Sequence, residues 1–360
     1  MQNIKLFIPG PVEIAPETYE AMSAPMIGHR SKDFQSLYAD LQPRLQTLFG
    51  TSSPVYLSTS SAWGIMEGAI RNTVQRKVLN CCGGAFSDKW YDVSKRCGKQ
   101  AEALQVDWGK PILPEAVEER LSTGDFDAVT VVHNETSTGV LNPLAEIAAV
   151  VRKFPDVLLI TDTVSSFSVV PTPFDEWGVD VLLTGSQKAL ALPPGLALFA
   201  LSERALTRAE QLPDRGYYFD FLEFQKNQVK DMTPSTPCIH TLYGLQQQLH
   251  AMEDEGLENR YARHAKLNER VAEWVSQQGF EFFAEPGYRS KSLTCIANNR
   301  GIDIPALQAK MRENHSIAMD GGYGKIKGTT FRLSNMGNET EQTIEGLLHA
   351  LDDSLAQIGS

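Results

Sequence analysis

Cysteine is scarce in this sequence, and the five cysteines follow no recognisable spacing: they are Cys81, Cys82, Cys97, Cys238 and Cys295. None of the intervals matches a metal-binding motif, so the sequence predicts no metal site. An odd number of cysteines without a framework is typical of free thiols in a reducing compartment. We therefore expect a cytoplasmic protein.

Long apolar runs are also missing. The segment from Met1 to Pro11 has no apolar core of the kind found in signal peptides, and the apolar run after Lys188 is interrupted by Pro193 and Pro194. A membrane-spanning helix needs about 20 consecutive apolar residues. The sequence therefore predicts neither a signal peptide nor a membrane segment.

Positive charge is in deficit. Lys and Arg number 33 against 44 Asp and Glu, which gives a net charge of -11 and an isoelectric point near 5.2. Binding to nucleic acid or to an anionic membrane surface depends on positive charge. We therefore expect neither of these partners.

Apolar residues, in contrast, are plentiful. They make up 42% of the 360 residues, which is enough for a sizeable core and for two domains. From Val55 to Leu201, strand-like apolar runs alternate with helical patterns, which favours a mostly parallel sheet covered on both faces. Ligands of such sheets bind at the carboxyl ends of the strands.

Two apolar runs between Leu158 and Gly195 end in polar residues at that edge. The first run ends in Asp162, and the second ends in Ser186-Gln187-Lys188. A buried lysine forms a Schiff base with an aldehyde, and an aspartate holds a protonated pyridine nitrogen; pyridoxal phosphate (PLP) requires both. Taken singly, Lys188 could be a lysine that reaches solvent and Asp162 a helix cap, and each of these is common at strand ends.

A second polar turn follows the predicted strand Val55–Leu57. Its residues are Ser58-Thr59-Ser60-Ser61-Ala62-Trp63-Gly64, and a helix follows. Free backbone N–H groups and the positive end of a helix suit an anion such as a phosphate. The same residues also suit an ordinary helix cap.

The two segments together resemble a known family. Asp162-Thr163-Val164-Ser165-Ser166, Gly185-Ser186-Gln187-Lys188-Ala189-Leu190 and Pro193-Pro194-Gly195 are similar to the PLP signature of class V aminotransferases, in particular the alanine-glyoxylate and serine-glyoxylate branch. The resemblance extends over nearly the whole chain. It implies that Lys188 binds PLP and moves protons, and that Asp162 keeps the pyridine nitrogen protonated.

The resemblance also implies roles for residues outside these two strands. It puts the PLP phosphate on the backbone at Ser61, Ala62 and Trp63. It puts Phe86 and Val164 on opposite faces of the ring, and Thr136 and Gln187 at the polar edge. Across the subunit boundary of a homodimer, it puts Thr236 on the phosphate of the partner's cofactor. For the substrate α-carboxylate it implies Arg332, because the planar guanidinium suits a bidentate pair.

The expected architecture is the α/β fold of fold-type I PLP enzymes, in which a large domain contains a mostly parallel sheet of seven strands. We expect an N-terminal arm at residues 1–20, the large PLP-binding domain at 21–255 and a small C-terminal α+β domain at 256–360. The predicted helices are 38–49, 65–70, 88–97, 239–255, 257–278, 303–314 and 339–358. Phe7–Glu17 is rich in proline and is predicted to be extended. The family resemblance implies that this segment crosses the partner subunit near the active site.

The expected reaction moves an amino group from alanine or serine to glyoxylate or pyruvate. Arg332 accounts for one carboxylate, and the sequence identifies no second cation for a dicarboxylate, so donors with small neutral side chains are favoured. Transamination of aspartate or phosphoserine is the main alternative. The roles of four basic residues that could approach the site stay open: His29, Arg30, Lys325 and Lys327.

Two further alternatives differ in kind. A PLP lyase or cysteine desulfurase on the same fold would need a nucleophilic cysteine on a mobile loop. Cys295 instead lies in the apolar run SLTCIA, which favours a buried and inert thiol. A binding protein without activity would retain the fold, but every catalytic position above holds a competent residue.

Overall fold

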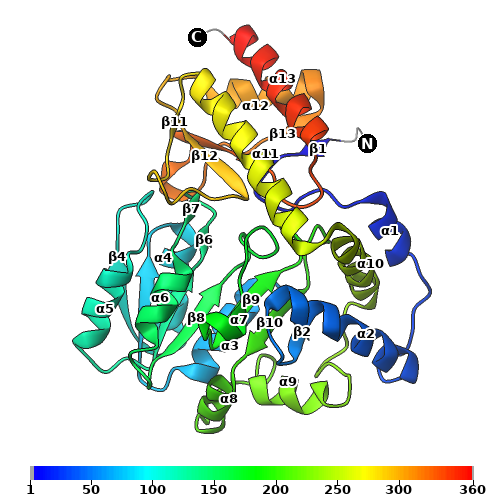
Figure 1. The fold of residues 1–360 in the computed structure, drawn as a ribbon, viewed down its shortest axis with the longest axis vertical. Helices are drawn as coiled ribbons and strands as arrows, with labels where there is room; N and C mark the ends of the chain where they lie inside the picture. Colours follow the sequence, from blue (N-terminus) through cyan, green and yellow to red (C-terminus); the bar gives the residue numbers. More distant parts are fainter. Residues whose placement is uncertain (1–3, 359–360) are drawn as a thin grey trace.

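A seven-stranded sheet forms the centre of the larger domain (Figure 1). The structure is a computed structural model that describes residues 4–358; residues 1–3 of the expected arm and 359–360 of the expected C-terminal domain lie outside the described residues. The strand order is β2-β10-β9-β8-β5-β3-β4, and β10 is antiparallel to both of its neighbours. The bounds are β2 Val55–Ser58, β3 Lys77–Cys82, β4 Gln100–Gln105, β5 Ala128–Val132, β8 Leu158–Asp162, β9 Val181–Gly185 and β10 Ala197–Leu201.

Alternating side chains of these strands contribute to two separate apolar clusters. In β3, Leu79 packs in the first cluster and Val78 in the second. In β9, Leu182 packs in the first cluster and Leu183 in the second. This period of two places a core on each face of the sheet. Because both faces are covered, the inner strands of the sheet are mostly apolar, whereas the edge strand β4 is partly exposed.

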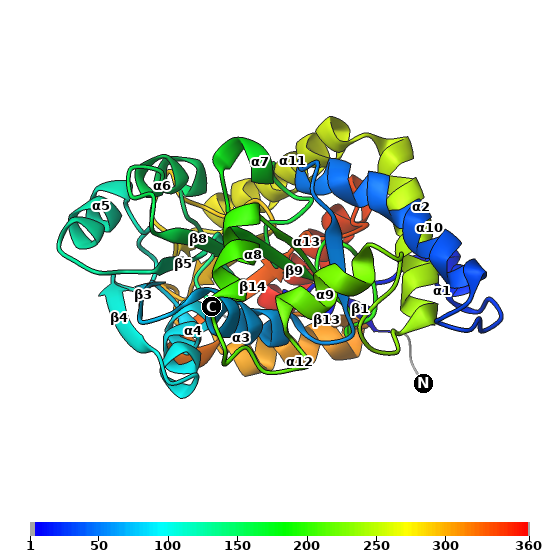
Figure 2. The same cartoon turned by 90° about the horizontal axis from the view of Figure 1, so that it is seen from below.

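Helices cover both faces of the sheet. Figure 2 shows α2, α6 and α7 along one side and α3 and α4 along the other. The first cluster packs against α2 Lys32–Phe49, α5 Pro114–Ser122, α6 Leu144–Val151, α7 Phe174–Trp177 and α10 Ile239–Glu255. The second packs against α3 Ala62–Thr73, α4 Ala85–Arg96, α8 Glu203–Glu210 and α9 Phe221–Gln228.

Three of the predicted helices begin earlier than the sequence pattern indicated, and one of them, expected from Ile65, begins at Ala62. The helix expected from Tyr38 begins at Lys32, where the Ser31 side chain accepts a hydrogen bond from the Phe34 N–H. The helix expected from Asp88 begins at Ala85, which puts Phe86 in its first turn. We attribute the early start of α4 to distant contacts. The Ala85 N–H donates to the Ser137 hydroxyl and the Ser87 N–H donates to the Glu135 carboxylate, 52 and 48 residues further along the chain.

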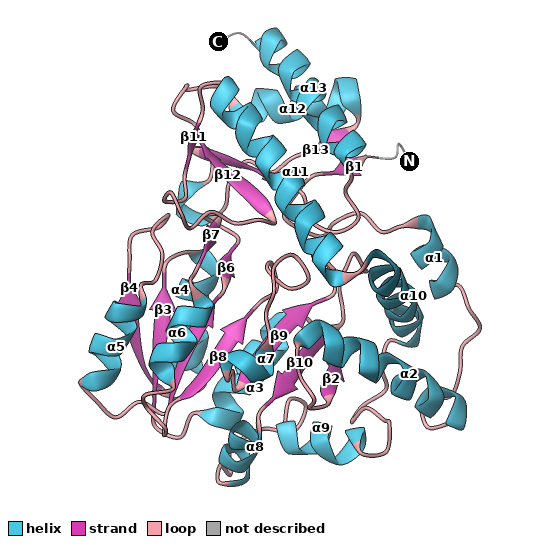
Figure 3. Cartoon of the chain, viewed as in Figure 1, coloured by secondary structure: helices cyan, strands magenta, loops and turns pink. Residues whose placement is uncertain are grey.

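The small domain lies beyond the carboxyl edge of the large sheet, at the top of Figures 1 and 3. It contains the antiparallel sheet β11-β12-β14 and the helices α11, α12 and α13, and α11 extends from it toward the large sheet. Its bounds are α11 Leu257–Gln277, β11 Glu281–Phe282, β12 Leu293–Ala297, α12 Ile304–His315, β13 Ile317–Ala318, the 3-10 turn Gly324–Ile326, β14 Thr330–Ser334 and α13 Glu341–Ile358.

The N-terminal segment joins this small domain. Strand β1, Lys5–Leu6, pairs in parallel with β13, and Phe7 lies in the apolar cluster of the small domain. The short helix α1, Pro16–Met22, then packs against α10, and its first two residues fall within the segment that was expected to be extended. Among residues 4–358, no helix combines the length and the apolar character that crossing a membrane requires.

Candidate active site

Lys188 lies in the turn directly after β9, at the carboxyl edge of the large sheet. Its side chain is buried, and its amino group donates a hydrogen bond to the Pro9 carbonyl oxygen. Burial, together with the positive charge of Arg332, lowers the pKa of Lys188 to about 8. A sizeable share of this amine is therefore neutral near physiological pH, which suits a nucleophile or a base.

Asp162 ends the neighbouring strand β8 and is also buried. Burial raises the pKa of this carboxyl group to about 7, although the Val164 N–H donates to one of its oxygens at 2.7 Å. The charge of Lys188 lowers the same pKa, so the two groups lie close enough to interact. A buried carboxylate of this kind is stabilised by a cation such as a protonated pyridine nitrogen.

The N-terminus of α3 lies beside the end of β9. Ser61 is the N-cap residue, and its side chain makes no capping hydrogen bond among the described residues. A Cβ atom built on Gly185 would lie 3.6 Å from the Ala62 Cβ. The start of α3 is therefore next to the end of β9, three residues before Lys188 in the sequence. The first turn thus offers backbone N–H groups to an anion. The Trp63 ring is covered by the Lys89 ammonium, 4.5 Å from its centroid.

Thr136 joins the two domains at the polar edge of the site. It follows the short strand β6, Asn134–Glu135, which pairs with β7, Val140–Leu141. Its hydroxyl lies 2.5 Å from the Ser165 hydroxyl, and its carbonyl oxygen accepts a hydrogen bond from Arg332 Nη1 at 2.8 Å. Thr136, Ser165 and Arg332 therefore lie together, although they come from three separate parts of the sequence.

Arg332 is buried on β14 and is paired with an acid that the sequence did not reveal. Its Nε donates to Asp320 at 2.7 Å. Of the five N–H groups of a guanidinium, two are used by Asp320 and Thr136, so three remain for an incoming carboxylate. Asp320 also accepts a hydrogen bond from the Gly322 N–H. This bond connects Arg332 to the glycine-rich loop formed by residues 321–328.

Phe86 lies in the first turn of α4 and stacks on Tyr323 from that loop. The ring centroids are 5.3 Å apart and the planes differ by 10°. Tyr323 lies in turn 5.5 Å from the Arg332 guanidinium. Gly324 and Lys325 contact Trp108 of the large domain, so this loop closes the gap between the domains next to Phe86.

Glu135 is a second buried acid that sequence reasoning did not single out. Its carboxylate accepts hydrogen bonds from the Ser87 N–H at 3.1 Å and from the hydroxyls of Ser87 and Ser137 at 2.9 and 2.6 Å. It thereby caps the N-terminus of α4 and fixes the turn that carries Phe86. The signal in the sequence was its position between Asn134 and the proposed contact Thr136.

The remaining expected residues are more scattered. Gln187 and Val164 flank Lys188 and Asp162 and are both partly buried. Thr236 is exposed, and its hydroxyl lies 3.5 Å from His29 Nε2. The segment of Thr236 contacts the β2–α3 turn, since the Cys238 N–H donates to the Thr59 hydroxyl at 3.2 Å.

Two polar residues near the site have packing roles. His133 is buried, burial lowers its pKa to about 3, and its ring packs edge-on against Trp177. Cys295 is buried in β12, and burial raises the pKa of its thiol to about 12. Such a thiol is protonated at neutral pH and is a poor nucleophile.

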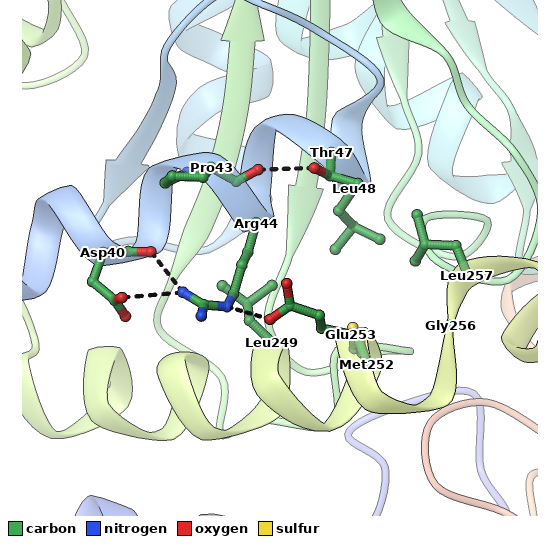
Figure 4. Close-up of a pocket in the computed structure, with 10 residues that line it drawn as sticks. All are labelled: Asp40, Pro43, Arg44, Thr47, Leu48, Leu249, Met252, Glu253, Gly256 and Leu257. Carbon is green, nitrogen blue, oxygen red and sulfur yellow. Dashed lines mark hydrogen bonds and ion pairs between the residues drawn. The ribbon is translucent and has the colours of Figure 1, made fainter.

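A separate cavity of about 430 Å³ lies between α2 and α10 (Figure 4). Arg44 lines it and donates hydrogen bonds to Asp40 and Glu253, and the side chains of Leu48, Leu249, Met252 and Leu257 also line it. None of the residues expected to bind PLP or substrate lines this cavity. It is therefore distinct from the site around Lys188.

Comparisons with known proteins agree with this geometry. The profile of the family described as aminotransferase class-V matches residues 78–338. The serine–glyoxylate aminotransferase of Methylorubrum extorquens is 35% identical, and the match covers 98% of this chain and 91% of that protein. The L-aspartate–glyoxylate aminotransferase of Paracoccus denitrificans is 33% identical, and the match covers 93% of this chain and 87% of that protein.

A solved structure shares the whole fold. The crystal structure of alanine–glyoxylate aminotransferase from Nostoc sp. superimposes with a TM-score of 0.94 and 29% sequence identity. The match covers 98% of this chain and 96% of that chain. Both the large sheet and the small domain are therefore common to the two proteins.

Proposed function

The chain belongs to the class-V aminotransferases, which are PLP-dependent enzymes, and we propose that it moves an amino group from alanine or serine to glyoxylate or pyruvate. The observation that carries the proposal is the buried pair of Lys188 and Asp162 at the ends of adjacent strands. The uncapped N-terminus of α3 beside them supports a phosphate group at the same site.

The residues present fit PLP. When bound, PLP supplies an aldehyde that condenses with amines and a ring that accepts electrons. We assign Lys188 to the aldehyde and Asp162 to the pyridine nitrogen, whose positive charge would offset the burial of this carboxylate. The backbone at Ser61, Ala62 and Trp63 would hold the phosphate.

The ring would be held by the side chains around it. We assign Phe86 and Val164 to its two faces. Val164 follows Asp162 by two residues, and Phe86 stacks on Tyr323, which lies 5.5 Å from Arg332. Gln187 and the Thr136 hydroxyl would contact its polar edge. We expect these groups to exclude water and to fix the ring plane.

The proton transfers belong to Lys188. With PLP and the substrate bound, the neutral Lys188 amine would take a proton from the substrate Cα and, as an ammonium group, would deliver it to the cofactor carbon that carried the aldehyde. The lowered pKa of Lys188, about 8, favours both directions near neutral pH. Arg332 orients the substrate by its α-carboxylate, and Asp320 keeps the guanidinium in place.

The preference for small neutral donors rests on the cations around the site. Arg30 is occupied by the carbonyl oxygens of Thr233 and Pro234, and Lys325 lies over the Trp108 ring. Each of these two therefore has a partner already. Lys327 is exposed, and His29 lies 3.5 Å from the Thr236 hydroxyl. Arg332 is the buried cation that we assign to the carboxylate. A second carboxylate in the substrate would be buried without a partner, which costs several kcal/mol.

A panel of amino donors tests the substrate proposal. With glyoxylate or pyruvate as acceptor, we expect alanine and serine to react at least about tenfold faster, in kcat/KM, than aspartate or phosphoserine. The conversion of the coloured lysine-bound cofactor in single turnovers gives the rate for each donor. Faster reaction of aspartate or phosphoserine would require a second cation in the pocket and would overturn the small-donor proposal.

Aspartate as donor is the second candidate, and one relative supports it. The L-aspartate–glyoxylate aminotransferase of Paracoccus denitrificans is nearly as similar as the serine–glyoxylate enzyme. The desulfurase alternative has less support. The candidate Cys295 is buried in β12, and its thiol pKa is raised to about 12 by burial.

A homodimer with shared active sites is part of the proposal. Thr236 is exposed, and three exposed apolar side chains, Tyr217, Tyr218 and Val229, lie on nearby segments of the chain. The Tyr218 hydroxyl bonds to the Thr59 carbonyl oxygen, next to the proposed phosphate site. Exposed apolar groups of this kind are typical of subunit interfaces.

Replacing Thr236 with alanine tests the shared site. We expect faster PLP loss from the variant on dilution, because one hydroxyl contact to the partner's phosphate is missing. Equilibrium dialysis at several protein concentrations measures the loss. Thr123→Ala, which changes an exposed threonine far from this segment, is the control. A fully active monomer in sedimentation would contradict the proposal.

A further inference from the structure

The N-terminal residues Lys5–Val12, here called the strap, begin in the small domain. Strand β1 pairs with β13, and the Phe7 N–H donates to the Ala318 carbonyl oxygen at 2.9 Å. The Phe7 carbonyl oxygen accepts from the Ser334 N–H at 3.0 Å. Ser334 is in β14, the strand of Arg332, so the first part of the strap is fixed to the strand that carries the proposed carboxylate contact.

The second part of the strap lies against Lys188. The Pro9 carbonyl oxygen accepts the hydrogen bond from the Lys188 amino group. The Val12 N–H donates to the Gln187 carbonyl oxygen at 3.2 Å, and the Val12 side chain packs in a small apolar cluster with Ala189 and Ala191. The strap therefore connects the strand of Arg332 to the turn of Lys188.

Gly10 lies where the strap passes the lysine side chain. A Cβ atom at this position would lie 2.7 Å from Lys188 Cδ, 2.8 Å from Nζ and 2.9 Å from Cε. A Cβ atom essentially never lies within 3.0 Å of atoms to which it is not bonded, so an alanine at this position would displace the buried Lys188 side chain. The φ angle of Gly10 is +117°, which also favours glycine.

We propose that the strap, through Gly10 and the Pro9 carbonyl oxygen, positions the Lys188 amine for proton transfer. The proposal rests on the aminotransferase function proposed above. After Lys188 takes a proton from the substrate, its ammonium group donates to Pro9 and stays close to the atoms that receive the proton back. Without this acceptor, a buried ammonium group would be left unpaired. Gly10 and Pro9 are thus positioning residues, since they act through Lys188.

The test compares two glycines that share the same backbone restriction. Gly287 also has a positive φ, +90°, but a Cβ atom there would have no neighbour within 4 Å, so Gly287→Ala adds the backbone strain without the contact. We expect Gly10→Ala to lower kcat by about 10- to 100-fold, the scale of a small misplacement of a reacting group. KM for the amino donor should change little, and Gly287→Ala should keep kcat within about threefold of the unchanged protein.

A second measurement does not depend on turnover. PLP is added to the cofactor-free proteins, the visible band of the lysine-bound cofactor is followed in time, and borohydride reduction fixes the product at Lys188. We expect slower attachment in Gly10→Ala than in Gly287→Ala. Equal kcat and equal attachment rates in these two variants would overturn the proposal.

Two further outcomes separate the possible failures. If the unchanged protein neither binds PLP covalently nor transaminates any donor, the proposed function itself fails. If Gly10→Ala does not fold, Val12→Ala decides instead, because it loosens the strap beside Lys188 without adding atoms. We expect Val12→Ala to slow both kcat and PLP attachment severalfold, and unchanged values would overturn the role of the strap.

Discussion

Replacing Lys188 with alanine is expected to abolish transamination while the protein still folds and binds PLP noncovalently. The variant loses both the covalent attachment and the only base that we propose for the proton transfers. Positioned acid–base groups contribute about 10²- to 10⁴-fold, so the loss of turnover should be at least of this order. Single-turnover kinetics with alanine or serine measures the loss, and equilibrium dialysis measures the PLP that remains bound.

Lys77 provides the control for this variant. It lies at the start of β3, opposite the carboxyl edge, and pairs with Glu102 at 2.7 Å. Lys77→Ala should therefore keep its turnover and its visible cofactor band. Near-normal turnover in Lys188→Ala would show that another group performs the proton transfers, and the mechanism proposed here would be wrong.

The large sheet and its functional edge were predictable because they depend on short-range pattern. The runs that form β8 and β9 are mostly apolar, β8 ends in Asp162, and β9 leads directly into Ser186-Gln187-Lys188. Parallel strands bring such ends to one edge, so Asp162 and Lys188 had to be close once the sheet was assumed. The strand predicted at Val55–Leu57 was also found, as β2, Val55–Ser58.

Contacts between distant segments could not be predicted from the same patterns. Strand β4 is a partly exposed edge strand with no apolar run, so it gave no signal. The first turn of α4 depends on Glu135, which is 48 residues from Ser87. The partners Asp320 of Arg332 and Pro9 of Lys188 likewise lie far away in the sequence. Each of these contacts is set by tertiary packing and not by local propensity.

Asp162 should make the cofactor-free protein less stable as the pH rises. Burial raises the pKa of this carboxyl group from 3.8 to about 7 in the folded protein, so the folded state binds more protons than the unfolded state between these values. Stability is therefore lost as the pH rises from about 4 through 7. At about 1.4 kcal/mol per pKa unit, the full effect is on the order of 4 kcal/mol.

Replacing Asp162 with asparagine separates this cost from the function. Asparagine keeps an oxygen for the Val164 N–H but carries no charge. We expect urea unfolding of the cofactor-free variant to give a higher free energy of unfolding than the unchanged protein at pH 8, and a similar value near pH 4. Turnover should fall by at least about 10²-fold, because the pyridine nitrogen loses the partner that keeps it protonated.

The two measurements on Asp162→Asn must move in opposite directions for the proposed role to hold. The lysine-bound cofactor should still form, since Lys188 is unchanged, and its visible band confirms that the site is loaded. A variant that is both less stable at pH 8 and less active would indicate a structural role for the carboxylate. A variant with unchanged turnover would mean that another group protonates the ring. Greater stability with lower activity is the pattern of a charge that is buried for catalysis and offset only when the cofactor is bound.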